Sequence, residues 1–366
     1  MSRTLFRAVA LAYLRHWAAI FVAVLAIYLV ADFVDRAKSY TGPHWMVNAL
    51  VLYGYKALVT ARQLAPASLL IGAGAAVSSL RRTGEVTAMR SLTLGPWALY
   101  APIGAVALVI SLALVAFDEV WVVKAGQRVD EITLQRFGGW GDWRFYNTPK
   151  QWFRTGDRII HLRGGGSQEG YNEVTLLRMT PEFRLEQRID ARLMRFAGGT
   201  RWRLVDAVER TFDQRGGTAL RRLPELVVDL GVDGEAFIIR QGRPEQMRIP
   251  ELEEQIGNRE AVGLPVAQYV LALHNRFAYP LAGLPAALLA VGLALRPGRK
   301  GHLTVALVEG LTVVMVLWGM MVIARALVVG ERIGAGVAAW LPVIVLVVSA
   351  SGLWLRREGR LGWRGS

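Results

Sequence analysis

The sequence predicts an α-helical membrane protein with six transmembrane helices and an all-β domain, jelly-roll-like in form, inserted between the third and fourth helices. Long apolar runs predict the helices. A polar segment at about residues 123–270, in which apolar and charged residues alternate, predicts the inserted domain. Of the 366 residues, 53% are hydrophobic and 20% are charged. This balance excludes both a wholly soluble chain and one wholly embedded in a membrane.

Each predicted span is long enough to cross the hydrocarbon core of a bilayer, which takes about 20 mainly apolar residues. The six spans cover approximately residues 17–34, 57–80, 97–122, 277–295, 303–329 and 337–355. They divide the chain into three parts. Three spans lie in residues 1–122, the β-rich insert and a connecting helix lie in 123–270, and three spans with a polar tail lie in 271–366.

Basic residues in the short connections predict the direction of the spans. One set of alternate connections holds Arg3, Arg7, Arg15, Arg81, Arg82, Arg90, Arg296, Arg299, Lys300, Arg356, Arg357, Arg360 and Arg364. The opposite connections hold far fewer, chiefly Arg36, Lys38, Lys56 and Arg332. By the positive-inside rule we expect both termini in the cytoplasm and the insert outside. The net charge of +14 then reflects membrane topology and not a nucleic-acid surface.

Strict alternation predicts β-strands in the insert. In "FRLEQRIDARL" (183–193), Phe183, Ile189 and Leu193 alternate with charged residues, and "RWRLVDAVERTF" (201–212) continues the pattern after turn glycines. Shorter strands are predicted at 157–162, 172–179, 225–230 and 236–240. Many short strands favour a sandwich or jelly-roll, either closed or open as a groove for an acyl chain. From residue 250 the pattern becomes helical and leads into the fourth span.

The sequence contains few residues that would support catalysis or the binding of a cofactor. The chain has no cysteine, which excludes disulfides, thiolate catalysis and Cys-bound zinc. It has no phosphate-binding loop of the G-x-x-x-x-G-K-[ST] type, and "RGGGSQEG" (163–170) lacks the required lysine. The five histidines are scattered. We therefore expect no metal, no bound cofactor and no enzymatic activity in this chain. The first apolar run is long enough to remain as a span, so no cleaved signal peptide is expected.

Several cations are predicted at one depth, near the outer ends of the spans. They are Arg36, Lys38, Arg62, Arg276 and Arg325. Ionisable groups inside spans are costly and usually face a cavity or a partner, so these residues could bind the anionic head groups of an amphiphile. The alternative is that each long side chain reaches to the membrane surface on its own.

"RRTGEVTAMRSL" (81–92) places Val86, Met89 and Leu92 on one stripe beside charged residues, which is typical of a short helix that docks on a partner or lies at the interface. A solvated turn is the alternative. Glu309 in the fifth span could pair with a basic residue or face another subunit. Prolines predict kinks at Pro66, Pro280, Pro285 and Pro342.

The chain resembles the LptF/LptG permeases of bacterial lipopolysaccharide export over nearly its whole length. The resemblance is carried by the order of spans and β insert and by "RRTGEVTAMRSLTLG", "LHNRFAYPLAGLPAALLAVGLAL" and "AAWLPVIVLVVSASGLWLRR". "ADFVDRAKSY" after the first span resembles the LptG member more than LptF. The resemblance implies a multi-pass inner-membrane subunit with a periplasmic β-jelly-roll.

The resemblance also implies partners and site residues. The permease would form an LptF–LptG heterodimer on two copies of the ATPase LptB, which uses ATP and Mg, with LptC alongside. The stretch at about 81–93 would be the coupling helix, and its expected ATPase-coupling residues are Arg82, Gly84, Glu85, Met89 and Arg90. Lipopolysaccharide would be taken from the outer leaflet and passed to the β domain. Arg36 and Lys38 gain support as lipid contacts from the LptG likeness.

Two alternatives to lipopolysaccharide export follow from the residues alone. The chain could be the permease of an ATP-driven transporter for another envelope lipid or a lipoprotein. It could also be a membrane-anchored envelope scaffold that transports nothing.

Overall fold

The computed structural model describes residues 3–137, 151–166, 169–212, 217–237, 243–296 and 303–361. The chain forms two compact units. The helical unit consists of Met1–Gly139 and Val270–Ser366, and the β unit consists of Trp140–Tyr269.

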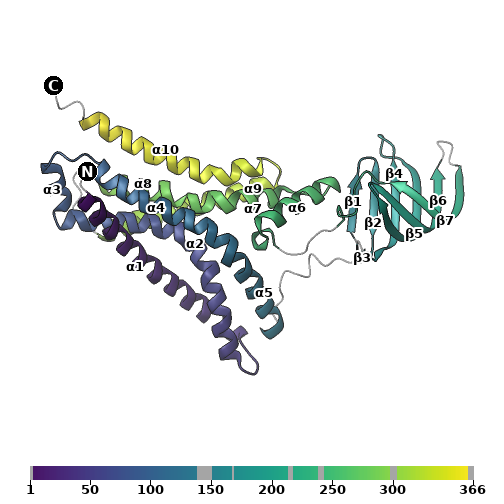
Figure 1. Cartoon of the computed structure of the whole chain (residues 1–366), viewed down its shortest axis with the longest axis horizontal. Coiled ribbons are helices and arrows are strands. Elements are labelled where there is room, and N and C mark those ends of the chain that lie inside the picture. Colours follow the sequence, from purple (N-terminus) through teal and green to yellow (C-terminus); the bar gives the residue numbers. More distant parts are fainter. Residues whose placement is uncertain are drawn as a thin grey trace. The chain divides into compact units, whose positions relative to one another are not determined.

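Long helices make up the helical unit (Figure 1). In chain order they are α1 (Arg3–Arg36), α2 (Trp45–Arg82), α4 (Trp97–Phe117), α5 (Val123–Phe137), α7 (Ala267–Leu281), α8 (Gly283–Ala294), α9 (Leu303–Val329) and α10 (Ala335–Leu361). Short helices η1 (Ala37–Ser39) and α3 (Glu85–Ser91) lie in connections, and the π-helical turn η2 (Asp118–Val122) joins α4 to α5. Within the described residues, six helical segments are long and apolar enough to cross a membrane, which confirms the predicted spans.

The helices extend beyond the apolar runs that predicted them. α2 begins at Trp45 and not near residue 57, and the helix of the third span continues through η2 and α5 to Phe137. Apolar runs mark only the part of a helix that requires a hydrocarbon environment, whereas intrahelical hydrogen bonds continue into polar sequence. The polar segment therefore starts as a helix.

α2 is the central helix of the helical unit, since it packs against α1, α5, α8 and α9. Small residues permit close approach of the backbones. A Cβ built on Gly72 would lie 2.8 Å from the Cα atom of Trp17 in α1. At the same interface the Tyr13 hydroxyl donates to the Leu69 carbonyl, and the Trp17 indole donates to Ser68 Oγ over 3.0 Å.

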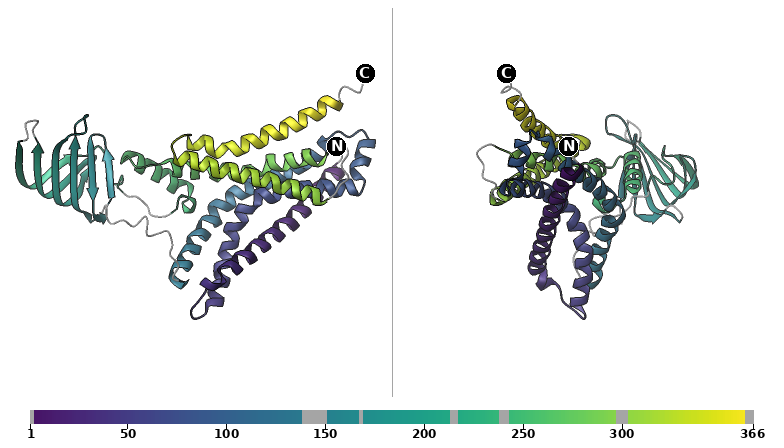
Figure 2. Two further views of the ribbon diagram at one scale, coloured as in Figure 1. Left: turned by 180° about the vertical axis from the view of Figure 1, so that it is seen from behind. Right: turned by 60° about the vertical axis from the view of Figure 1, so that its left-hand side comes forward.

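The β unit contains an antiparallel sheet, which confirms the predicted all-β insert (Figure 1). Its strands are β1 (Gln151–Thr155), β2 (Arg158–Leu162), β3 (Gly164–Gly166), β4 (Gly170–Met179), β5 (Leu185–Gly198), β6 (Arg201–Phe212) and β7 (Thr218–Asp229). The order is β1-β2-β4-β5-β6-β7, with β3 paired to β4. The described strands thus form one continuous antiparallel sheet, in which β2 pairs with β4 and the other neighbours in the order are consecutive in the chain. Figure 2 shows the curvature of this sheet.

The β unit also holds η4 (Pro244–Gln246) and α6 (Ile249–Ala261), the helix predicted from residue 250 onward. The strand predicted at 236–240 is wrong for its first two residues, because Ala236 and Phe237 lie in a turn. Residues 238–240 lie outside the described residues. Phe237 instead packs into the core of the sheet beside Trp202, with the ring centroids 5.2 Å apart.

The alternation of buried and exposed side chains in β5 shifts by one residue part-way along the strand. The predicted assignment of residues to the buried face is therefore wrong beyond that point. Ile189 and Ala191 are buried, but the next buried residue is Met194 and not Leu193. Phe183 lies outside the strand, in an exposed turn. The slip is shared by both neighbouring strands, where the buried pairs Tyr171/Val174 in β4 and Leu204/Ala207 in β6 are also three residues apart.

Two left-handed residues accommodate this slip. Glu173 and Asp206 have φ values of 47° and 56°, and the strand register places both opposite Arg192 of β5. Arg192 Nε lies 2.7 Å from Asp206 Oδ2. Because residues with a Cβ seldom adopt positive φ, the pattern of residue types did not indicate this irregularity.

We predict that Gly72→Leu lowers the free energy of unfolding by about 1–3 kcal/mol, because the added side chain forces α1 and α2 apart. Gly54→Leu is the matched control, since a Cβ on this exposed glycine of α2 would meet no atom within 4 Å. Thermal unfolding of the purified protein in detergent measures both variants. Equal effects of the two substitutions would contradict the close α1–α2 contact.

Candidate functional site

The connection between α2 and α4 forms a short helix, α3, held by a tight reversal of the chain. Gly84 precedes α3 with φ of 81°, a conformation that other residues adopt only with strain, and its carbonyl accepts the first helical hydrogen bond from Ala88. The side chain of Thr83 donates to Glu85 Oε1 over 3.0 Å. This reversal sets the direction in which α3 leaves α2.

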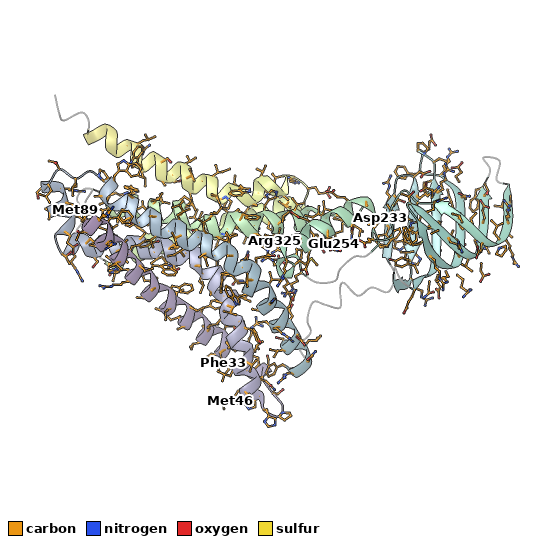
Figure 3. All side chains as sticks on the ribbon, in the orientation of Figure 1. Phe33, Met46, Met89, Asp233, Glu254 and Arg325 are labelled. Carbon is orange, nitrogen blue, oxygen red and sulfur yellow. The ribbon has the colours of Figure 1, made fainter. Side chains whose placement is uncertain are left out.

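α3 has one apolar and one charged face. Val86 and Met89 are buried in the core of the helical unit, and Figure 3 shows Met89 in this helix. Arg82, Glu85 and Arg90 are exposed. Met89, which is expected among the ATPase-coupling residues, is only 7% exposed and packs against the spans of its own chain. The apolar stripe anchors α3 to its own unit, because only Leu92 of the predicted stripe, 70% exposed, remains outside.

A guanidinium group ties the end of α2 to the end of α8. Arg81 donates to the carbonyl of Ala294, and its Nη1 lies 3.4 Å from the carbonyl of Arg296. The last carbonyls of a helix lack intrahelical donors and carry partial negative charge, so a cation there is stabilising. Arg296 in turn lies 3.9 Å from Glu309 of α9, which gives that carboxylate a basic partner.

The five predicted lipid-binding cations do not form one cluster within this chain. Arg36 ends α1, where it lies 3.3 Å from Asp32, and Lys38 follows in η1; both side chains are exposed. Arg325 is exposed on α9, away from the region of Phe33, as Figure 3 shows. Arg62 and Arg276 lie elsewhere, on α2 and α7.

Asp118 brings Arg62 and Arg276 together. Arg62 Nε lies 2.8 Å from Asp118 Oδ2, and Arg276 Nη1 donates to Asp118 Oδ1 over 2.8 Å. The side chains of Asp118 and Arg276 are only 1% and 3% exposed, and that of Arg62 is 18% exposed. We call these three residues the Asp118 triad. Arg276, which is expected among the lipid-binding cations, is therefore buried within this chain and paired with Asp118.

The comparisons with known proteins identify the fold. The family described as "Lipopolysaccharide export system permease LptF/LptG" matches residues 7–357, nearly the whole chain. The chain belongs to the LptF/LptG family. This membership, with the six apolar helical segments, makes it a multi-pass membrane permease of lipopolysaccharide export. A search of curated proteins gave no match.

In this permease, Asp118 is the residue that sequence reasoning missed. It lies near the end of an apolar run, beside Glu119, where a carboxylate is easily taken for the polar flank of a span. The π-helical turn η2 begins at Asp118, whose carbonyl accepts from the N–H of Val123, five residues on. Such turns are frequent at functional sites, but residue types alone do not reveal them.

We predict that Asp118→Leu destabilises the permease by about 3–5 kcal/mol, because it leaves buried guanidinium charge without its carboxylate. Adding Arg276→Met should recover much of the loss, since a buried ion pair replaced as a whole by apolar residues costs little. Thermal unfolding in detergent measures the single and double variants.

The control for the Asp118 prediction is Glu131→Leu, which removes an exposed carboxylate paired with Arg128 and should change stability by less than about 1 kcal/mol. A double variant that is less stable than Asp118→Leu alone would contradict the role of Asp118 as the partner of Arg276.

Proposed function

We propose that this chain is the LptG-type subunit of an ATP-driven permease that extracts lipopolysaccharide from the outer leaflet of the inner membrane. Its partners would be an LptF-type subunit, an LptB-type ATPase dimer and an LptC-type periplasmic protein. Membership in the LptF/LptG family over residues 7–357 is the observation that carries the proposal. The likeness of "ADFVDRAKSY" to the LptG member supports the choice of subunit.

The two faces of α3 support its role as the coupling helix. Because Val86 and Met89 hold α3 against the core, a force on its exposed face passes to the helices beneath it. The exposed charges of Arg82, Glu85 and Arg90 would contact a groove of the ATPase, with Gly84 fixing the approach. ATP and Mg would bind to the ATPase and not to this chain.

The contacts of α2 provide a route for the force. α3 follows α2 directly, Arg81 joins α2 to α8, and α2 packs along α1 and α9. Movement of the ATPase would therefore shift several spans together and narrow the cavity between the two permease subunits. Lipopolysaccharide would be expelled toward the periplasmic β unit and from there to the LptC-type protein.

The basic connections support an orientation with α3 and both termini in the cytoplasm and the β unit in the periplasm. Arg36, Lys38 and Arg325 are then exposed cations of the outer half of the helical unit, suited to lipid phosphates. Arg62 is partly exposed, while Arg276 would act indirectly, by fixing Asp118.

We predict that Glu85→Lys uncouples ATP hydrolysis from lipid extraction or prevents assembly with the ATPase, because it reverses a charge on the exposed face of α3. ATPase activity, extraction and co-purification of the ATPase are measured for the reconstituted complex. Glu131→Lys, on the exposed face of α5, is the matched control. Extraction at the wild-type rate would remove Glu85 from the mechanism.

We predict that reversing Arg36 and Lys38 together to Glu lowers photo-crosslinking of lipopolysaccharide at least fivefold, because phosphate then meets like charge. Reversal of Lys124 and Arg128, two exposed cations of α5, is the control double variant. Undiminished crosslinking at the α1 end would show that Arg36 and Lys38 only extend to the membrane surface.

A further inference from the structure

A cluster of aromatic side chains surrounds the connection between α1 and α2. Tyr40 directly follows η1 and is only 8% exposed. Its ring stacks on the ring of Phe33 with the centroids 5.9 Å apart, and it meets the ring of Phe137 of α5 edge to face at 4.9 Å. Figure 3 marks Phe33 near this end of α1. Because aromatic pairs at such distances are stabilising, Tyr40 fixes the chain at the point where η1 ends.

Hydrogen bonds connect Tyr40 to the carboxylate of Asp32. The hydroxyl of Tyr53 in α2 donates to Asp32 Oδ2 over 2.6 Å. The hydroxyl oxygens of Tyr40 and Tyr53 lie 3.1 Å apart. A phenol has a single proton to donate, and Tyr53 donates its proton to Asp32, so Tyr40 is the donor to Tyr53. The residue after η1 is therefore joined to Asp32 through one intermediate hydroxyl group.

Asp32 also contacts the residue that precedes η1. Its Oδ1 atom lies 3.3 Å from Nε of Arg36, and its Oδ2 atom accepts a hydrogen bond from Lys56 of α2. The side chains of Asp32 and Lys56 are 12% and 17% exposed, whereas that of Arg36 is 59% exposed. Lys56 therefore provides the opposite charge that a nearly buried carboxylate requires. The two cations and one carboxylate together keep a formal charge of +1, and Arg36 is its exposed member.

Both ends of η1 are thus joined to one carboxylate. Arg36 at its start contacts Asp32 directly, and Tyr40 at its end contacts it through Tyr53. Lys38 lies in the three residues between them. A single helical turn has little stability of its own, because one hydrogen bond does not offset the backbone entropy that is lost. The geometry of η1 therefore depends on these two attachments.

The contact with Asp32 occupies only part of the Arg36 guanidinium group. It involves Nε, and the remaining N–H donors of a guanidinium are on its two Nη atoms. Those donors can bind a phosphate through two parallel hydrogen bonds, the arrangement typical of arginine. Lys38 is exposed two residues further on and can add a second cation.

We propose that Asp32 is a positioning residue for the binding of lipopolysaccharide. Asp32 acts through η1: it fixes both ends of this turn and so holds Arg36 and Lys38 where they meet the phosphates of the lipid. Cations that are held in place bind more tightly, because less conformational entropy is lost on binding. The inference rests on the proposed function for the identity of the ligand and adds the residue that organises its site.

Asp32→Asn and Tyr53→Phe, each in the complete reconstituted permease complex, test the proposal. Asn removes the charge of Asp32, and Phe removes only the hydroxyl that joins Tyr40 to it. We expect each variant to lower photo-crosslinking of lipopolysaccharide at the α1 end by about threefold or more. Since both act through one carboxylate, the double variant should lower crosslinking by less than the product of the two single effects.

The matched control is Asp35→Asn, which removes an exposed carboxylate of the same helical turn and should not lower crosslinking. This control separates positioning from simple electrostatics. If Asp32 only reduced the local positive charge, its removal would strengthen the attraction of phosphate and raise crosslinking. Raised or unchanged crosslinking in Asp32→Asn would therefore overturn the proposal.

A spin label reports the mobility of η1 directly. The chain has no cysteine, so a label can be attached at Ser39→Cys, an exposed position in η1. We expect Asp32→Asn and Tyr53→Phe to make this label more mobile, whereas a label at Val22→Cys, exposed in the middle of α1, should not change. Unchanged mobility at residue 39 would overturn the proposal.

Reversal of Arg36 and Lys38 to Glu distinguishes this inference from the proposed function. If the reversal lowers crosslinking and the Asp32 and Tyr53 variants do not, the lipid contact stands and the positioning role of Asp32 is wrong. If the reversal leaves crosslinking undiminished, the proposed lipid contact is wrong, and the inference that depends on it is overturned as well.

Discussion

A carboxylate that is removed from water must be paired, and in this permease Asp118 meets that requirement with two guanidinium groups. The pairing joins helices from both sides of the insert, since Arg62 and Asp118 precede the β unit in the chain and Arg276 follows it. The spans before and after the insert therefore form one unit. Close packing along α2 also stabilises this unit, because the missing side chain of Gly72 lets the backbone of α1 come near. This contact depends on complementary shape and not on charge.

The coupling function that we infer depends on the two faces of α3, one apolar and buried and the other charged and exposed. A helix of seven residues has no stability of its own in water, so its apolar side must be held by the spans if its charged side is to transmit a force. Val86 and Met89 provide this anchor, and Arg81 extends it to α8. The exposed charges are then presented on a firm base and not on a mobile loop.

Much of the fold could be predicted from the sequence because hydrocarbon imposes a simple demand of length and composition. The six spans and the β insert follow from apolar runs and from alternation in segments such as 201–212. Details set by three-dimensional packing could not be predicted. The irregularity opposite Arg192 requires positive φ at Glu173 and Asp206, two residues with a Cβ. Met89 is buried because of the side chains around it. The role of Asp118 becomes clear only from its contacts with Arg62 and Arg276. The sequence predicts how deep a residue lies along a span, but it does not predict which way its side chain faces.

The split origin of the Asp118 triad has a consequence for biosynthesis. A ribosome delivers Arg62 and Asp118 well before Arg276, and the whole β unit is made in between. The first three spans can therefore form their ion pair while the later spans do not yet exist, and this pair offers an unoccupied carboxylate oxygen to the fourth span on its arrival. The second ion pair of the triad can therefore form only after the whole β unit has been synthesised.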